Sequence, residues 1–102
     1  MDTLANQLRM EVLEYNKYGS KEAREKAIKA FQTVSCTAFE VAQNGESKLK
    51  FNEKLLPREC SKYFEYLCDR EGLKFKEILE RTPDFLTHYE VSWEWQQWTN
   101  AI

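Results

Sequence analysis

Glycine and proline are scarce in this sequence, with three glycines and two prolines among 102 residues. This composition is far from that of low-complexity or disordered chains, so we expect order along the whole chain. The glycines at positions 19, 45 and 72 are widely separated, and each falls where a predicted helix ends. No Walker-type or dinucleotide-binding loop can be built from them, which disfavours enzymes that hold phosphate groups in such a loop.

Histidine and cysteine are also rare, since His88 is the only histidine and the cysteines are Cys36, Cys60 and Cys68. No pattern supplies the orienting group or the nucleophile that a catalytic histidine needs. Cys60 and Cys68 would lie about 12 Å apart along one helix, too far for two ligands of one zinc ion. All three thiols are expected to be reduced core residues. The sequence therefore predicts no enzyme, no metal site and no cofactor.

The chain has neither an excess of one charge nor a long apolar run. Fifteen basic and 17 acidic residues give a formal net charge of −2, and the signs are interspersed, as in KEAREKAIK at 21–29. Such a pattern is typical of a solvated surface rather than of a polyanion-binding protein. No run approaches the roughly 20 apolar residues of a membrane span, and the first residues lack the order of a signal peptide. We therefore expect a cytoplasmic protein with no membrane partner.

Two helices are predicted in the N-terminal part of the chain. Between positions 3 and 18, apolar residues recur at helical spacing on one face, and Gly19 is placed to end this helix. The members of this apolar face are Leu4, Ala5, Leu8, Val12 and Tyr15. Ser20 suits the N-cap of a second helix that runs to residue 43 or 44. The short connection predicts an antiparallel helical hairpin over 3–44.

The remaining sequence predicts a β-α-β-β unit over 47–96. Residues 47–52 alternate as a short strand, Pro57 fits the first turn of a third helix that ends at Gly72, and 73–79 form a second strand. After a turn at 82–84, FLTHYEVSWEW at 85–95 alternates as the clearest strand. We predict a single compact domain over 1–102 with a short tail at 97–102. Its fold is α+β, α-α-β-α-β-β, with the helical hairpin and the third helix packed on one face of a small three-stranded, largely antiparallel sheet.

The strings LKFNEKLL at 49–56 and LKFKEILE at 73–80 are similar enough to suggest a duplicated module. Nothing matches upstream at the same offset, and the first string runs into a helix while the second runs into a hairpin. We therefore interpret them as two strands of one sheet, with leucine and phenylalanine facing inward and lysine facing outward.

This arrangement would gather four lysines on the polar side of the sheet. We call it the lysine face; its members are Lys48, Lys50, Lys74 and Lys76. Such a face beside aromatic strands resembles a platform for nucleic acid. Glu90 and Glu94, however, project onto the same side and would neutralise lysines across the strands. Nucleic-acid association through the lysine face is therefore the alternative function.

Several large apolar side chains lie off the predicted core faces, namely Met10, Leu13, Tyr66 and Trp98. Methionine and aromatic residues are enriched at protein interfaces, although single exposed apolar residues are common on any surface. The leading prediction is a non-enzymatic interaction or regulatory protein that acts stoichiometrically through such a patch, on a protein partner or on a second copy as a homodimer. Short acidic domains without motifs are frequent among phage and mobile-element accessory proteins that bind a host or defence component, and we include that origin in the prediction.

Overall fold

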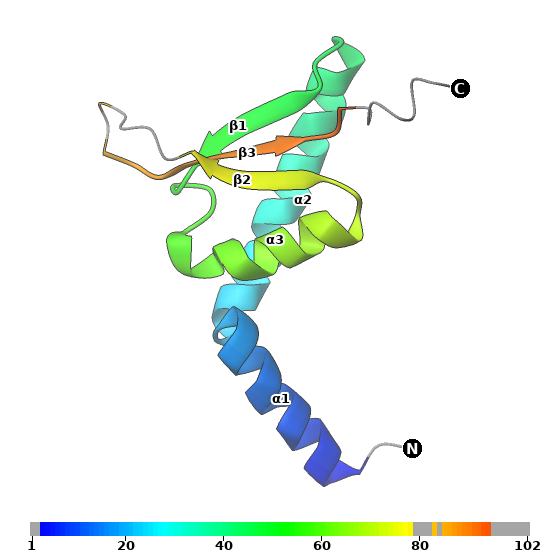
Figure 1. The fold of residues 1–102 in the computed structure, drawn as a ribbon, viewed down its shortest axis with the longest axis vertical. Helices are drawn as coiled ribbons and strands as arrows, with labels where there is room; N and C mark the ends of the chain where they lie inside the picture. The colour runs from blue at the N-terminus through cyan, green and yellow to red at the C-terminus, as the bar shows by residue number, and fades with distance from the viewer. Residues whose placement is uncertain (1–2, 79–82, 84, 95–102) are drawn as a thin grey trace.

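The computed structural model describes residues 3–78, 83 and 85–94. Its order, α-α-β-α-β-β, and its α+β class confirm the prediction (Figure 1). The elements are α1 (Leu4–Tyr18), α2 (Lys21–Gln43), β1 (Lys48–Asn52), the short 3₁₀ helix η1 (Arg58–Cys60), α3 (Ser61–Arg70), β2 (Lys74–Ile78) and β3 (His88–Ser92).

Both N-terminal helices begin and end where local chemistry predicts. The Thr3 hydroxyl accepts a hydrogen bond from the Asn6 amide at 3.2 Å, and the Ser20 hydroxyl accepts one from the Ala23 amide at 3.1 Å. Each of these bonds satisfies an amide that the first turn of a helix leaves unpaired. Gly19 ends α1 at φ 90°, a conformation that favours glycine. The predicted cap residues Gly19 and Ser20 are therefore confirmed.

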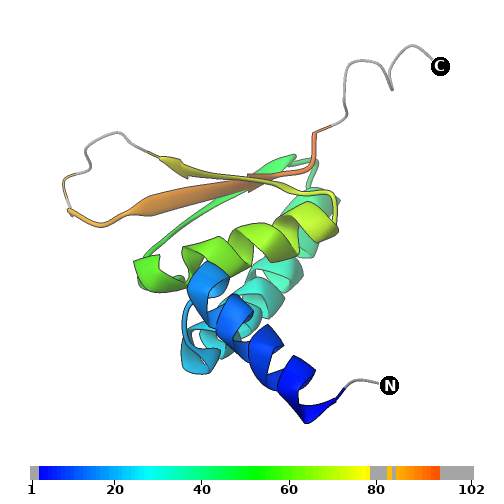
Figure 2. The ribbon, with the colours of Figure 1, turned by 60° about the horizontal axis from the view of Figure 1, so that its bottom comes forward.

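The three strands form an antiparallel sheet in the order β1-β3-β2, so the last strand of the chain lies in the centre. Helices α2 and α3 lie on one side of this sheet, and no helix of the described chain covers the other side (Figure 2). β3 is shorter than the predicted strand at 85–95. Phe85 has φ 58°, in the left-handed region, and this conformation cannot continue an extended strand.

An aromatic core lies between the sheet and the two helices. Phe64 of α3 is fully buried, and its ring centroid lies 5.1 Å from that of Phe75, 5.5 Å from Phe51 and 5.7 Å from Phe31. Each strand of the sheet and both covering helices contribute to the surrounding cluster. Pairs at these separations add to the stabilisation that burial of the rings already gives.

Two of the three thiols belong to this core. Cys60 and Cys68 are fully buried, as predicted, whereas Cys36 is exposed and the prediction of a core thiol is wrong there. Cys36 is two residues, or about 200° of helical turn, from the buried Val34, so it falls on the opposite side of α2. The prediction grouped it with the other cysteines by residue type and did not weigh its position on the helix. Burial, reinforced by the carboxylate of Asp69, raises the pKa of the Cys68 thiol to about 12.

The first helix packs differently from the predicted hairpin. Gly19 and Ser20 have ψ values of −165° and 162°, and the connection does not fold α2 back along α1. α1 buries none of its residues. Only its C-terminal half is held in place by these contacts. Arg24 of α2 forms ion pairs with Glu14 and, at 3.3 Å, with Glu11. The ring of Tyr18 packs on two tyrosines of α3. The N-terminal half projects from the end of the molecule opposite the sheet (Figure 1).

Candidate functional site

The most exposed apolar surface of the described chain is α1. Its predicted apolar face, formed by Leu4, Ala5, Leu8, Val12 and Tyr15, is called the α1 stripe below. The large side chains of this stripe are more than half exposed, at 69% for Leu4, 57% for Leu8, 59% for Val12 and 61% for Tyr15. Met10 and Leu13, on the opposite side of the helix, are exposed to 56% and 58%. A helix of 15 residues is marginal in water unless packing supports it, and a helix that is apolar on both sides is normally buried. Within the residues that the structure describes, α1 therefore lacks the packing that normally supports such a helix.

The C-terminal half of α1 also forms a shallow notch with the start of α2. Val12 and Tyr15 of the α1 stripe line it on one side, and Lys21 and Arg24 of α2 line it on the other. The Arg24 guanidinium is largely buried, with a side chain only 13% exposed, and it holds the two helices at a fixed angle through its acidic partners on α1. The notch is thus a preformed continuation of the stripe.

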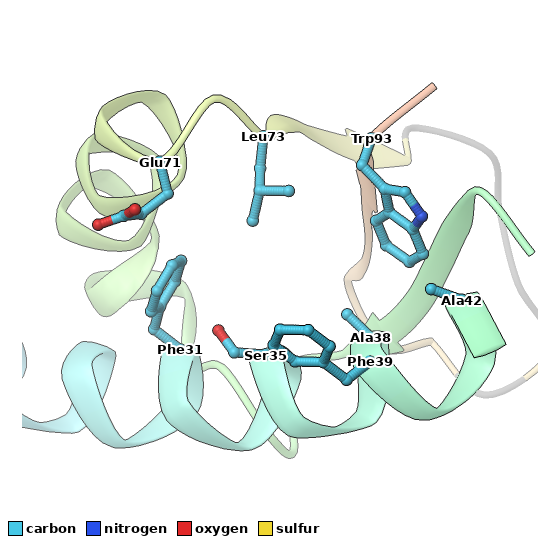
Figure 3. Close-up of a pocket in the computed structure, with 8 residues that line it drawn as sticks. All are labelled: Phe31, Ser35, Ala38, Phe39, Ala42, Glu71, Leu73 and Trp93. Carbon is cyan, nitrogen blue, oxygen red and sulfur yellow. The ribbon is translucent and has the colours of Figure 1, made fainter. Parts of the chain in front are cut away.

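A second apolar surface is a groove of about 370 Å³, with α2 on one side and Glu71, Leu73 and Trp93 on the other. Figure 3 shows Phe31 and Phe39 rising from α2, with Leu73 and Trp93 facing them across the gap. The Trp93 indole N–H donates to the Glu46 carbonyl at 3.1 Å, which fixes the ring at one end. Phe39 is 73% exposed at the rim. The groove is open and apolar, and among the described residues on its wall Glu71 alone is charged.

The sheet order brings the whole lysine face together on the uncovered side. Lys48 and Lys74 both lie in register with Ser92, and Lys50 and Lys76 both lie in register with Glu90. The Glu90 side chain is only 10% exposed, and its carboxylate lies 3.2 Å from the Lys76 ammonium group. The predicted neutralisation by Glu90 is therefore present for that row. In the other row Ser92 lies between Lys48 and Lys74, and Glu94 and Asp69 line the same hollow as these two lysines.

The structure places the predicted interface residues separately rather than in one patch. Met10 and Leu13 share one side of α1, and Tyr66, 40% exposed, lies on α3 beside Tyr18. Trp98 falls outside the described residues. Sequence reasoning missed the α1 stripe as a surface because it assigned the stripe to the core. It also missed the Phe39 rim, although the unusually wide apolar arc of α2 was a signal for a second contact.

In the part of the chain that is described, no three histidine, cysteine or acidic side chains lie close enough to hold a metal ion. Burial raises the pKa of both core thiols, with Glu59 adding to the effect at Cys60, so neither favours the reactive thiolate. His88 is half-buried on the polar side of β3, opposite Asn52 and Ile78.

Within residues 3–78, 83 and 85–94, no helix combines the length and apolar character required to cross a membrane. Comparison of the chain with protein-family models, with curated proteins and with solved structures finds no significant match in any of the three.

Proposed function

We propose that this protein is a non-enzymatic interaction protein that binds a protein partner stoichiometrically through α1. The observation that carries the proposal is that α1 buries none of its 15 residues while it exposes large apolar side chains on both sides. The four large members of the α1 stripe are each more than half exposed, and a contiguous apolar patch on the surface of a monomer is often functional. Covering this area would supply the packing that the helix lacks.

The way in which α1 is held supports a role in recognition. The cap at Thr3 and the ion pairs of Arg24 fix the start and the direction of the helix before any partner arrives. A preformed helix loses less conformational entropy on binding than a segment that must fold at the same time. The proposal includes a cytoplasmic location, which the three free thiols support because reduced cysteines are usual in that compartment.

The test is to purify the tagged full chain from its native cells and to compare it with three variants. Two variants alter α1, Leu8→Glu with Val12→Glu on the stripe and Met10→Glu with Leu13→Glu on the opposite side. The third, Lys48→Ala with Lys74→Ala, alters only the sheet. We expect a protein component in stoichiometric amount, a second copy included, that is lost in at least one α1 variant and kept in the sheet variant. Equal recovery with all variants would refute a role for α1.

A second candidate function is association with nucleic acid through the lysine face. The observation that favours it is the row formed by Lys48 and Lys74 on either side of Ser92, on the uncovered side of the sheet. Binding of this kind weakens steeply as salt increases, because it releases counterions from the phosphates. The binding of a fluorescent single-stranded oligonucleotide should then fall with salt and be lost in Lys48→Ala with Lys74→Ala. Binding that is insensitive to both changes would exclude this function.

A further inference from the structure

We infer that the partner of α1 is a second copy of this chain. The two α1 helices pair antiparallel through their stripes, about a twofold axis that lies at the level of position 10 along the helix. This inference rests on the proposed function, because it identifies the partner of the same helix. It assigns the contact to the α1 stripe, whereas the sequence had placed candidate interface residues on the other side of α1.

The spacing along the α1 stripe is that of a coiled-coil contact. Ala5, Leu8, Val12 and Tyr15 follow one another at intervals of three, four and three residues. This alternation of three and four keeps apolar side chains on one line that faces a partner helix. α2 does not occupy that line, since Leu8, Val12 and Tyr15 are all more than half exposed.

The stripe is also symmetric about its centre, and this decides the orientation. When two copies run antiparallel about position 10, Ala5 of each copy lies opposite Tyr15 of the other, and Leu8 lies opposite Val12. Every layer then combines a larger side chain with a smaller one, which is how facing helices fill space evenly. A parallel pair would place two Tyr15 rings against each other and leave two Ala5 methyl groups with a gap between them.

The rest of the molecule leaves room for this pairing. The ion pairs to Arg24 involve Glu11 and Glu14, which flank the stripe and do not cover it. The N-terminal half of α1 projects beyond α2, at the end opposite the sheet (Figure 1). In the antiparallel pair, Leu4 and Ala5 of one copy therefore reach the notch between Val12, Tyr15 and α2 of the other. The two sheets then lie at opposite ends of the dimer.

The size of the contact sets its strength. The contact joins one short stripe from each copy, so we expect it to lie near the lower end of the roughly 1,200–2,000 Å² that standard stable complexes bury. The notch adds further area at both ends of the pair. The dimer should therefore be reversible, forming as the protein concentration rises through the micromolar range.

The first measurement is sedimentation velocity of the full chain over a range of about 1 to 500 μM, around and above the micromolar affinity expected. The expected result is a concentration-dependent shift from the monomer mass of 12.2 kDa towards twice that mass. Leu8→Glu with Val12→Glu should weaken the association at least tenfold. Met10→Glu with Leu13→Glu is the matched control, because it adds the same charge to the same helix but on the opposite side, and it should leave the association unchanged.

The second measurement tests the orientation by disulfide formation in a Cys36→Ser background, in which the remaining native thiols are buried. Leu8→Cys and Val12→Cys are prepared as separate proteins. On mild air oxidation, an equimolar mixture should give mainly the cross-linked heterodimer, and each protein alone should give little. Efficient cross-linking of each protein to itself would indicate parallel pairing and overturn the inference.

A monomer at every concentration would also overturn the inference, as would a dimer that survives the stripe substitutions and is lost in the Met10 and Leu13 variant. The proposed function has a separate outcome. If the chain is monomeric but a different protein co-purifies with it and is lost in an α1 variant, the second copy is the wrong partner and α1 remains the binding element.

Discussion

Removal of one hydroxyl group from the core should stabilise this protein. The Tyr89 side chain is 1% exposed, and its ring lies between Phe51 and Phe75, with centroids 5.5 Å away on each side. Its buried hydroxyl has no hydrogen-bond partner among the described residues. A buried hydroxyl without a partner costs about 1–3 kcal/mol relative to water, and Tyr89→Phe removes that cost while it keeps the ring. We expect the free energy of unfolding at pH 7 to rise by about 1 kcal/mol.

The same substitution should change the response to alkaline pH. Burial, with smaller contributions from Glu77 and Glu53, raises the pKa of Tyr89 from its ordinary value near 10 to about 12. Below pH 10 both the folded and the unfolded states keep the proton, so Tyr89 adds no pH dependence. Between pH 10 and 12 only the unfolded state loses it, and stability falls by about 1.4 kcal/mol per pH unit, to at most about 3 kcal/mol. The Tyr89→Phe protein should not show this part of the loss of stability at alkaline pH.

Urea unfolding followed by far-ultraviolet circular dichroism at pH 7, 9, 10 and 11 measures both effects. Any loss of stability at alkaline pH that is due to Cys68 is common to both proteins, so it cancels when the variant is compared with wild type. Tyr15→Phe is the control, because Tyr15 is 61% exposed and the substitution should alter neither value. A Tyr89→Phe protein that is less stable than wild type by 1 kcal/mol or more at pH 7 would show that the hydroxyl has a partner and would refute the reasoning.

Two further predictions concern the core. Phe64→Ala should lower the free energy of unfolding by about 3–5 kcal/mol in urea titrations, because Phe64 is fully buried at the centre of the aromatic cluster; a loss below about 1 kcal/mol would mean that the cluster rearranges freely. Reaction of the native protein with a chromogenic disulfide reagent should show one fast thiol, Cys36, and two thiols that react only as the protein unfolds, since Cys60 and Cys68 are buried and their pKa values are raised. Three fast thiols would contradict the packing of α3.

Much of this fold could be predicted from local patterns. Ser20 and Gly19 mark the helix ends because their side chain and backbone meet needs that arise within one turn of chain. The strands were readable from the alternation of lysine with leucine and phenylalanine, and the pairing of Lys76 with Glu90 follows from that alternation once the strands are neighbours. In each case, the residues that determine the feature lie within a few positions of it in the sequence or on the neighbouring strand.

The position of α1 could not be predicted in the same way. Periodicity shows that a helix has an apolar face, but it does not show which surface covers that face. Two residues, Gly19 and Ser20, decide whether α1 folds back along α2 or continues away from it, and either arrangement is compatible with the same stripe. The groove beside Trp93 was missed for a related reason, since it is formed by α2, by the connection between α3 and β2, and by Trp93, which are far apart in the sequence.

The order of the strands has a consequence for synthesis of the protein. β1 and β2 pair only with β3, which is the last strand to be made but the central one in the sheet. No hydrogen bond of the sheet can form until residues 88–92 have left the ribosome. Until then, α1, α2 and α3 can form as local helices, while β1 and β2 have no partner strand. A nascent chain that stalls before residue 88 is thus a helical intermediate with two unpaired strands, and it is the form of this protein on which chaperones would act.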